Sequence, residues 1–151
     1  MLSGSNINPV ESLEIPEVDG RYNRTVQEYV EVIRDLTAKS AVARVKDIAE
    51  QRGVTRASVS SAVGSLVELG LVRHEHYGYV TLTEPGRELG DAMTLRHRVI
   101  RQFLENLLQL EPEIADREAC ILEHTMSPET LNALVRFIRK VDGCPRCCST
   151  K

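Results

Sequence analysis

Three side chains able to bind a metal ion lie close together in the C-terminal part of the sequence: Cys120, Glu123 and His124. If this segment is helical, residues at i, i+3 and i+4 project from one face, so the thiol, carboxylate and imidazole can reach a common point. Such a mixed donor set suits Fe(II), Mn(II), Co(II) or Zn(II) better than Ca(II) or Mg(II). Taken alone, the triplet fits equally simple packing, a buried cysteine beside a surface Glu-His pair.

The segments before this triplet predict a DNA-binding fold. Apolar residues at helical spacing predict three helices, at 25–40, 45–51 and 55–69. Gly53 provides the turn between the second and third helices, and Thr55 caps the third. Alternating apolar residues then predict a β-hairpin from 72–76 and 79–82. Three helices and a hairpin in this order make a winged helix-turn-helix, whose third helix enters the major groove of DNA.

The rest of the chain is expected to be helical. Three more helices are predicted, at 85–110, 112–125 and 127–143. The last begins with a strong signal, Ser127 as N-cap followed by Pro128. The predicted parts are an N-terminal extension at 1–22, a winged domain at 23–84, a helical domain at 85–142 and a Cys-rich tail at 143–151.

The charge and the cysteines limit the possible classes of function. The net charge is −3, and residues 21–90 hold ten Lys and Arg against nine Asp and Glu, so a basic DNA-binding surface must come from local arrangement. Neither a membrane-spanning apolar run nor a secretory signal is visible, so we expect a cytoplasmic protein without a membrane partner. The tail cysteines Cys144, Cys147 and Cys148 fit half a zinc site, a redox pair or, as the favoured reading, free thiols.

Several short motifs in a fixed order resemble those of a known family. They are Glu28-Tyr29-Val30-Glu31, Val45-Lys46-Asp47-Ile48-Ala49-Glu50, Leu82-Thr83-Glu84-Pro85-Gly86-Arg87, Arg96-His97, and Glu118-Ala119-Cys120 with Glu123-His124 and Met126-Ser127. Together they resemble the metal-dependent repressors of the diphtheria toxin repressor and manganese transport regulator type, over about residues 25–141.

The resemblance implies a fold and a function. The expected fold is mainly α, an N-terminal winged helix-turn-helix followed by an all-helical dimerisation domain. The expected function is metal-dependent repression of transcription in iron or manganese homeostasis, by a homodimer on an operator in double-stranded DNA. Neither an enzymatic activity nor a small-molecule substrate is expected. A chain of 151 residues leaves no room for the SH3-like third domain of the iron branch, so we expect the two-domain form.

The resemblance also implies a set of metal ligands. They are Glu28, Glu31, His97, Cys120, Glu123 and His124. The set is a hybrid, because Cys120 is the residue of the iron branch and Glu28 that of the manganese branch. A thiolate with an imidazole favours Fe(II), with Mn(II) as second choice. Glu28 fits equally well as the last residue of a capping box that begins at Thr25.

The number of ions is left at one or two per protomer. The iron branch has an ancillary site with an acid and a histidine at the positions of Arg101 and Asp116, and an arginine cannot bind a cation. A second ion would therefore be bridged by Glu31 and share His97.

Candidate DNA contacts lie in the winged part. On the third helix, the residues expected to read bases are Thr55, Arg56, Ser58 and Ser61. Phosphate contacts are expected from Arg44 and Lys46. In the wing, the candidates are His74, His76 and Tyr77. The alternatives are a metal-independent winged-helix regulator and, with less support, a thiol or metal redox protein that uses the Cys-rich tail.

Overall fold

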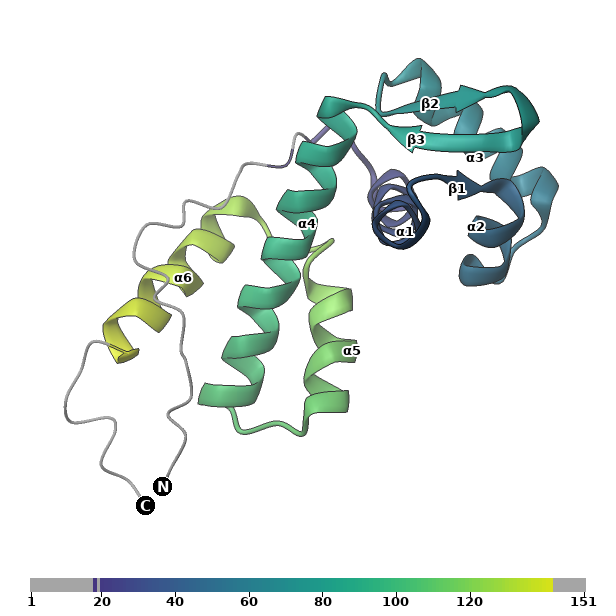
Figure 1. The fold of residues 1–151 in the computed structure, drawn as a ribbon. Coiled ribbons are helices and arrows are strands. Elements are labelled where there is room, and N and C mark those ends of the chain that lie inside the picture. The colour runs from purple at the N-terminus through teal and green to yellow at the C-terminus, as the bar shows by residue number, and fades with distance from the viewer. Residues whose placement is uncertain (1–17, 19, 143–151) are drawn as a thin grey trace.

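The computed structural model describes residue 18 and residues 20–142. It is mainly helical, with a winged part at one end, a helical part at the other, and one long helix, α4 (Glu84–Gln102), reaching from the first into the second (Figure 1). This confirms the predicted fold class. None of the described helices is both long and apolar enough to cross a membrane.

Three helices form the body of the winged part. They are α1 (Arg24–Ser40), α2 (Val45–Arg52) and α3 (Arg56–Glu68). Gly53 has φ +65°, which a glycine adopts without strain, and it separates α2 from α3. The Thr55 hydroxyl accepts a hydrogen bond from the amide of Ser58 and caps α3, as predicted. Helix α1 is capped by Asn23, which accepts from the amide of Val26, so the capping box predicted at Thr25 is wrong.

A small antiparallel sheet completes the wing. Strands β1 (Ala43–Arg44), β2 (Val72–Glu75) and β3 (Tyr79–Leu82) have the order β1-β3-β2, with Val72 opposite Leu82 and Ala43 opposite Val80. A short 3-10 turn, His76–Gly78, joins β2 to β3. The predicted hairpin is confirmed, whereas β1 was not predicted.

Helix α4 belongs to two hydrophobic cores. Its first half contributes Leu89 and Met93 to the core beneath the winged part, and its second half contributes Val99 and Ile100 to the core of the helical part. Its start lies so close to the winged part that a Cβ on Gly86 would be 2.0 Å from the carbonyl oxygen of Leu71. The two parts are therefore joined by continuous packing along α4.

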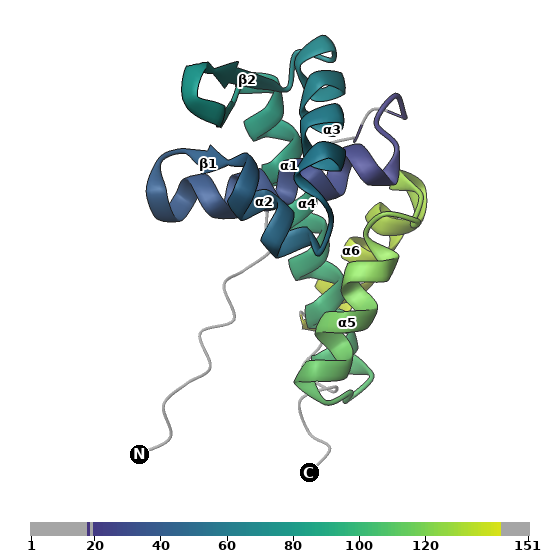
Figure 2. The ribbon, with the colours of Figure 1, turned by 90° about the vertical axis from the view of Figure 1, so that its right-hand side faces the viewer.

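The helical part contains two more α-helices, α5 (Pro112–Leu122) and α6 (Pro128–Asp142), which flank α4 (Figures 1 and 2). Two predicted helix ends are wrong. The helix predicted to reach residue 110 is α-helical only to Gln102 and is followed by a π-helical turn, Phe103–Leu107. Helix α5 ends at Leu122, three residues before the predicted Thr125. Ser127 caps α6 by accepting from the amide of Thr130, as predicted.

Candidate metal centre and nucleic-acid interface

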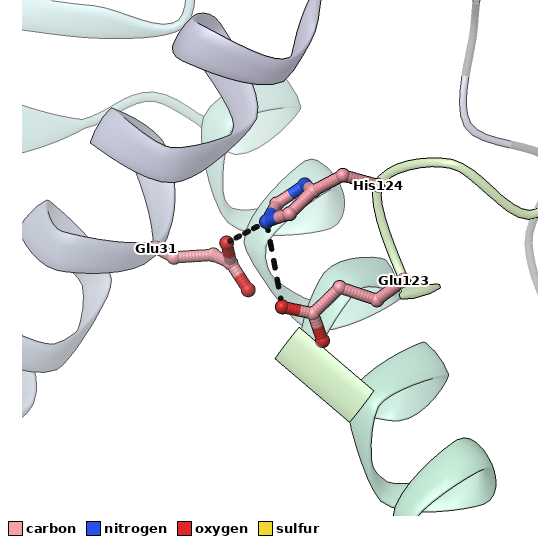
Figure 3. A group of neighbouring side chains, drawn as sticks. All are labelled: Glu31, Glu123 and His124. Carbon is pink, nitrogen blue, oxygen red and sulfur yellow. Dashed lines mark ion pairs between the residues drawn. The ribbon is translucent and has the colours of Figure 1, made fainter. Parts of the chain in front are cut away.

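Three side chains from separate segments converge between the winged and helical parts. Glu31 comes from α1, and Glu123 and His124 come from the turn that follows α5 (Figure 3). One ligand atom from each lies within 4.8 Å of the others, and His124 Nε2 is 3.4 Å from both Glu31 Oε2 and Glu123 Oε1. Two carboxylate oxygens and one imidazole nitrogen thus face one point.

The turn after α5 directs these side chains. Helix α5 ends at Leu122, and Glu123 is its C-cap, with a helical backbone and an amide that donates to the carbonyl of Ala119. His124 lies beyond the helix, so the prediction that it shares a regular helix with Cys120 is wrong. The amide of Met126 donates to the carbonyl of Leu122, which tightens the turn. The buried guanidinium of Arg96 donates from Nη2 to the carbonyl of Met126 and so fastens the turn to α4.

The imidazole of His124 is the feature of this cluster that best fits a cation site. Its side chain is 1% exposed, and its Nε2 has no hydrogen-bond partner in the described part of the chain. Burial lowers the pKa of His124, which favours the neutral ring with a lone pair. A buried, unpartnered nitrogen between two carboxylate oxygens fits a divalent metal ion, which requires deprotonated ligands.

The electrostatics of Glu31 lead to the same conclusion. Burial, followed by the nearby Glu123 carboxylate, raises the pKa of Glu31 from 4.5 to about 7. The ionised form is therefore unfavourable without a cation, and a divalent ion would reverse that effect.

His97 is held by hydrogen bonds on both ring nitrogens. Nδ1 lies 2.8 Å from Glu123 Oε2 and Nε2 lies 3.0 Å from Asp116 Oδ1. The hydrogen bond with Glu123, opposed by burial and supported by Asp116, raises the pKa of His97 to about 9. Asp116 also accepts from Arg101 at 3.2 Å, so arginine occupies the place where the iron branch was expected to bind a second cation. His97 can become a ligand only by releasing one of these carboxylates.

The remaining predicted ligands lie at the same cavity but do not join the converging trio. All six predicted residues line one cavity of about 370 Å³. The Glu28 carboxylate is paired with Arg24 and Arg52, each at 2.8 Å. Cys120 is a free, exposed cysteine, and partial burial together with the Glu123 carboxylate raises the pKa of its thiol.

Two contacts at this cavity were missed from the sequence. The side chain of Gln27 accepts a hydrogen bond from His124 Nδ1. Arg52, the last residue of α2, donates a hydrogen bond to the carboxylate of Glu28. The only local sign that the Glu28 carboxylate is paired with a cation was Arg24, which lies four residues earlier, a spacing typical of ion pairs on a helix. The other contacts join residues far apart in the chain.

The predicted DNA contacts are exposed and belong to the winged part. They are Arg44, Lys46, Thr55, Arg56, Ser58, Ser61, His74, His76 and Tyr77. The guanidinium of Arg44 lies over the ring of Tyr79, 5.4 Å from its centre. Tyr77 is 94% exposed and has φ +73°, so the turn between β2 and β3 presents its ring to solvent. The surface can meet a nucleic acid through α3 and this turn.

Two family models match the chain. The iron dependent repressor, N-terminal DNA binding domain, matches residues 22–80, and the iron dependent repressor, metal binding and dimerisation domain, matches residues 83–149. The second match includes the tail cysteines Cys144, Cys147 and Cys148, which we expected to lie beyond the resemblance and which lie outside the described residues.

Individual relatives are regulators. The chain is 35% identical over 115 residues to the transcriptional regulator MntR of Salmonella typhimurium, covering 76% of this chain and 73% of MntR. It is 30% identical over 121 residues to the iron-dependent repressor IdeR of Mycobacterium bovis, covering 80% of this chain and 53% of IdeR. The solved structure of the manganese regulator SloR matches with a TM-score of 0.65 and 30% identity, covering 80% of this chain and 56% of SloR. The chain thus spans about half the length of SloR and of two other solved structures that it matches.

Proposed function

Because the chain belongs to the iron-dependent repressor family of metal-dependent transcriptional regulators, we propose that a divalent metal ion held by Glu31, Glu123 and His124 switches it to its operator-binding form. The observation that carries the proposal is the buried, unpartnered Nε2 of His124 between two carboxylates that come from different parts of the fold.

These ligands can couple the metal centre to DNA through the position of α1. Glu31 belongs to α1, which packs against α2 and α3 in the winged core, whereas Glu123 and His124 are anchored to the helical part. A bound divalent ion supplies the positive charge that lets the two carboxylates and the imidazole remain together. Held to one point, these residues fix α1, and with it α3, relative to the helical part. Metal binding thereby shifts the population of dimers toward the conformation in which the two α3 helices are positioned to bind DNA.

The identity of the metal depends on Cys120. Two carboxylate oxygens and one imidazole nitrogen suit Mn(II) and Fe(II) alike. A Cys120 thiolate that turns into the cavity would favour Fe(II), our first choice, and a site without it would shift the relative preference toward Mn(II). His97 and Glu28 complete the shell when they leave Asp116 and Arg52, and one ion per protomer accounts for the converging atoms.

The proposal also covers assembly and location. The predicted boundaries, 23–84 for the DNA-binding domain and 85–142 for metal binding and dimerisation, are retained. A homodimer presents two α3 helices to two operator half-sites. Because its target is DNA, we place the protein in the cytoplasm, and we assign it no enzymatic activity.

The deciding experiment compares operator binding with and without a chelator. Glu123→Ala and His124→Ala should each abolish metal-dependent DNA binding while leaving a folded dimer, because each removes a ligand from the trio. Glu88→Ala, on the exposed face of α4, is the matched control and should behave as the wild type. DNA binding by the wild type that ignores the chelator would instead support a metal-independent winged-helix regulator.

A further inference from the structure

Gln27 is a buried polar residue that the predicted ligand set does not include. It lies on α1 one turn before Glu31, and only 7% of its surface is exposed. We propose that Gln27 is a positioning residue that fixes which ring nitrogen of His124 carries the proton and so aims the Nε2 lone pair at the metal point. This proposal rests on the proposed metal site and adds a residue to its function.

The orientation of the Gln27 amide is set by the backbone. Its Nε2 donates to the carbonyl oxygen of Tyr22 at 2.8 Å, and a carbonyl can only accept. The amide cannot be turned over without placing its Oε1 against that carbonyl. Its Oε1 must therefore face the other partner, Nδ1 of His124, which lies 2.8 Å away.

The orientation of the amide then determines the tautomer of His124. An amide oxygen accepts hydrogen bonds and never donates them, so Nδ1 of His124 must carry the hydrogen. In the neutral ring the lone pair is then on Nε2, the atom that lies 3.4 Å from an oxygen of Glu31 and of Glu123. All three atoms at the point are acceptors, which is the arrangement that a cation satisfies. Residues that hold a ligating histidine in this way contribute to metal affinity in other proteins.

The contact also joins the two parts of the fold. Gln27 and His124 are 97 positions apart in the sequence, one on α1 and the other in the turn after α5. The hydrogen bond therefore holds α1 and the turn at a fixed distance from each other in the metal-free protein. Preorganisation of this kind lowers the cost of binding.

The test uses the full chain and two variants. Gln27→Met keeps the length of the side chain but removes the acceptor, and Gln27→Glu keeps an acceptor toward His124. Both lose the donor to Tyr22, so that loss cancels in the comparison, and the two variants differ in the acceptor and in the charge that it carries. Gln51→Met, on the exposed face of α2, is the matched control.

Two readouts separate positioning from general stability. Nitrogen NMR of the metal-free protein identifies the protonated ring nitrogen of His124, and titration with Mn(II) alone measures affinity. We expect a hydrogen on Nδ1 in the wild type, in Gln27→Glu and in Gln51→Met. Gln27→Met should give a mixture of tautomers and bind Mn(II) about 10- to 100-fold more weakly, while Gln27→Glu should retain most of the affinity.

Three results would overturn the proposal. A wild-type His124 that carries its hydrogen on Nε2 contradicts the tautomer. A Gln27→Met protein with the wild-type tautomer and affinity removes the role of Gln27 but leaves the metal site intact. A wild-type protein that binds neither Mn(II) nor, under anaerobic conditions, Fe(II) removes the proposed function itself, and with it any role of Gln27 in metal binding.

Discussion

The replacement Glu31→Gln should stabilise the metal-free protein at alkaline pH while weakening its binding of metal. In the folded protein, burial and the Glu123 carboxylate raise the pKa of Glu31 from 4.5 to about 7. The folded state therefore holds the Glu31 proton more tightly than the unfolded chain. The stability that results is fully present below pH 4.5 and is lost as the pH rises through about 7.

The size of this effect follows from the shift. Each pKa unit corresponds to about 1.4 kcal/mol, so ionising Glu31 in the folded protein costs about 3 kcal/mol once the pH exceeds the folded pKa. The side chain remains 23% exposed, and part of the cost was already present at about pH 5. Between about pH 5 and about pH 8, the free energy of unfolding of Glu31→Gln should therefore rise relative to the wild type by about 2 kcal/mol.

The assay is urea unfolding in the presence of a chelator, at one fixed protein concentration because a dimer's stability depends on it. His97, with its pKa raised from 6.5 to about 9, contributes stability that is lost over a higher pH range in both proteins, so most of this loss cancels in the difference between them. Glu88→Gln, an exposed carboxylate on α4, should show no such trend. A difference that is independent of pH would refute the raised pKa of Glu31, and a Glu31→Gln protein that binds Mn(II) as the wild type does would remove Glu31 from the proposed metal centre.

Three further predictions address the surroundings of the metal centre and the DNA surface. Arg52→Met removes a cation beside the cavity and frees the Glu28 carboxylate, so Mn(II) should bind roughly 3- to 10-fold more tightly in a calorimetric titration; weaker binding would show that Arg52 supports the site. Arg56→Ala should weaken operator binding in a mobility-shift assay, by about 1–3 kcal/mol if the guanidinium reads a base, and unchanged affinity would mean that α3 is not the reading helix. Cys120→Glu should move activation of DNA binding from Fe(II) toward Mn(II) in anaerobic titrations, and a constant ratio of the two half-activating concentrations would exclude Cys120 as the determinant of metal choice.

The elements that were predicted from sequence carry strong local signals. Gly53 and Thr55 mark the turn and the start of α3 wherever the rest of the chain goes, and Ser127 does the same for α6. Strand β1 has only two residues and exists because Ala43 pairs with Val80, a contact that no local pattern encodes. Val67 follows the buried Val63 by one helical turn but is 43% exposed, because α3 buries only a narrow stripe.

The end of α5 shows the same limit at the metal centre. No glycine or proline follows Leu122 until Pro128, so the local sequence permits a longer helix. Beyond the end of the helix, Arg96 binds the carbonyl of Met126 and so fastens the turn to α4, a contact between distant segments. The resemblance to a known family predicted Glu123 and His124 as ligands. Their convergence with Glu31, however, depends on packing between segments about 90 residues apart.

The charges around the cavity explain why one point, and not several, is left for a cation. At the periphery, arginines already partner the carboxylates: Arg24 and Arg52 at Glu28, and Arg101 at Asp116. A second ion at Asp116 would have to displace a guanidinium that the chain itself supplies.

At the centre, by contrast, Glu31 Oε2 and Glu123 Oε1 face a buried imidazole nitrogen without a hydrogen-bond partner among the described residues, while the other oxygen of Glu123 is paired with His97. No arginine reaches this point in the described structure, and the only cation that the metal-free protein can add there is a proton, which the raised pKa of Glu31 reflects. At the proposed metal site, protons and metal ions would therefore compete for one position, so we expect metal binding to release protons near neutral pH and to strengthen as the pH rises through about 7. The repulsion between the Glu31 and Glu123 carboxylates destabilises the metal-free fold. A bound ion would remove this repulsion, and the free energy released would favour metal binding.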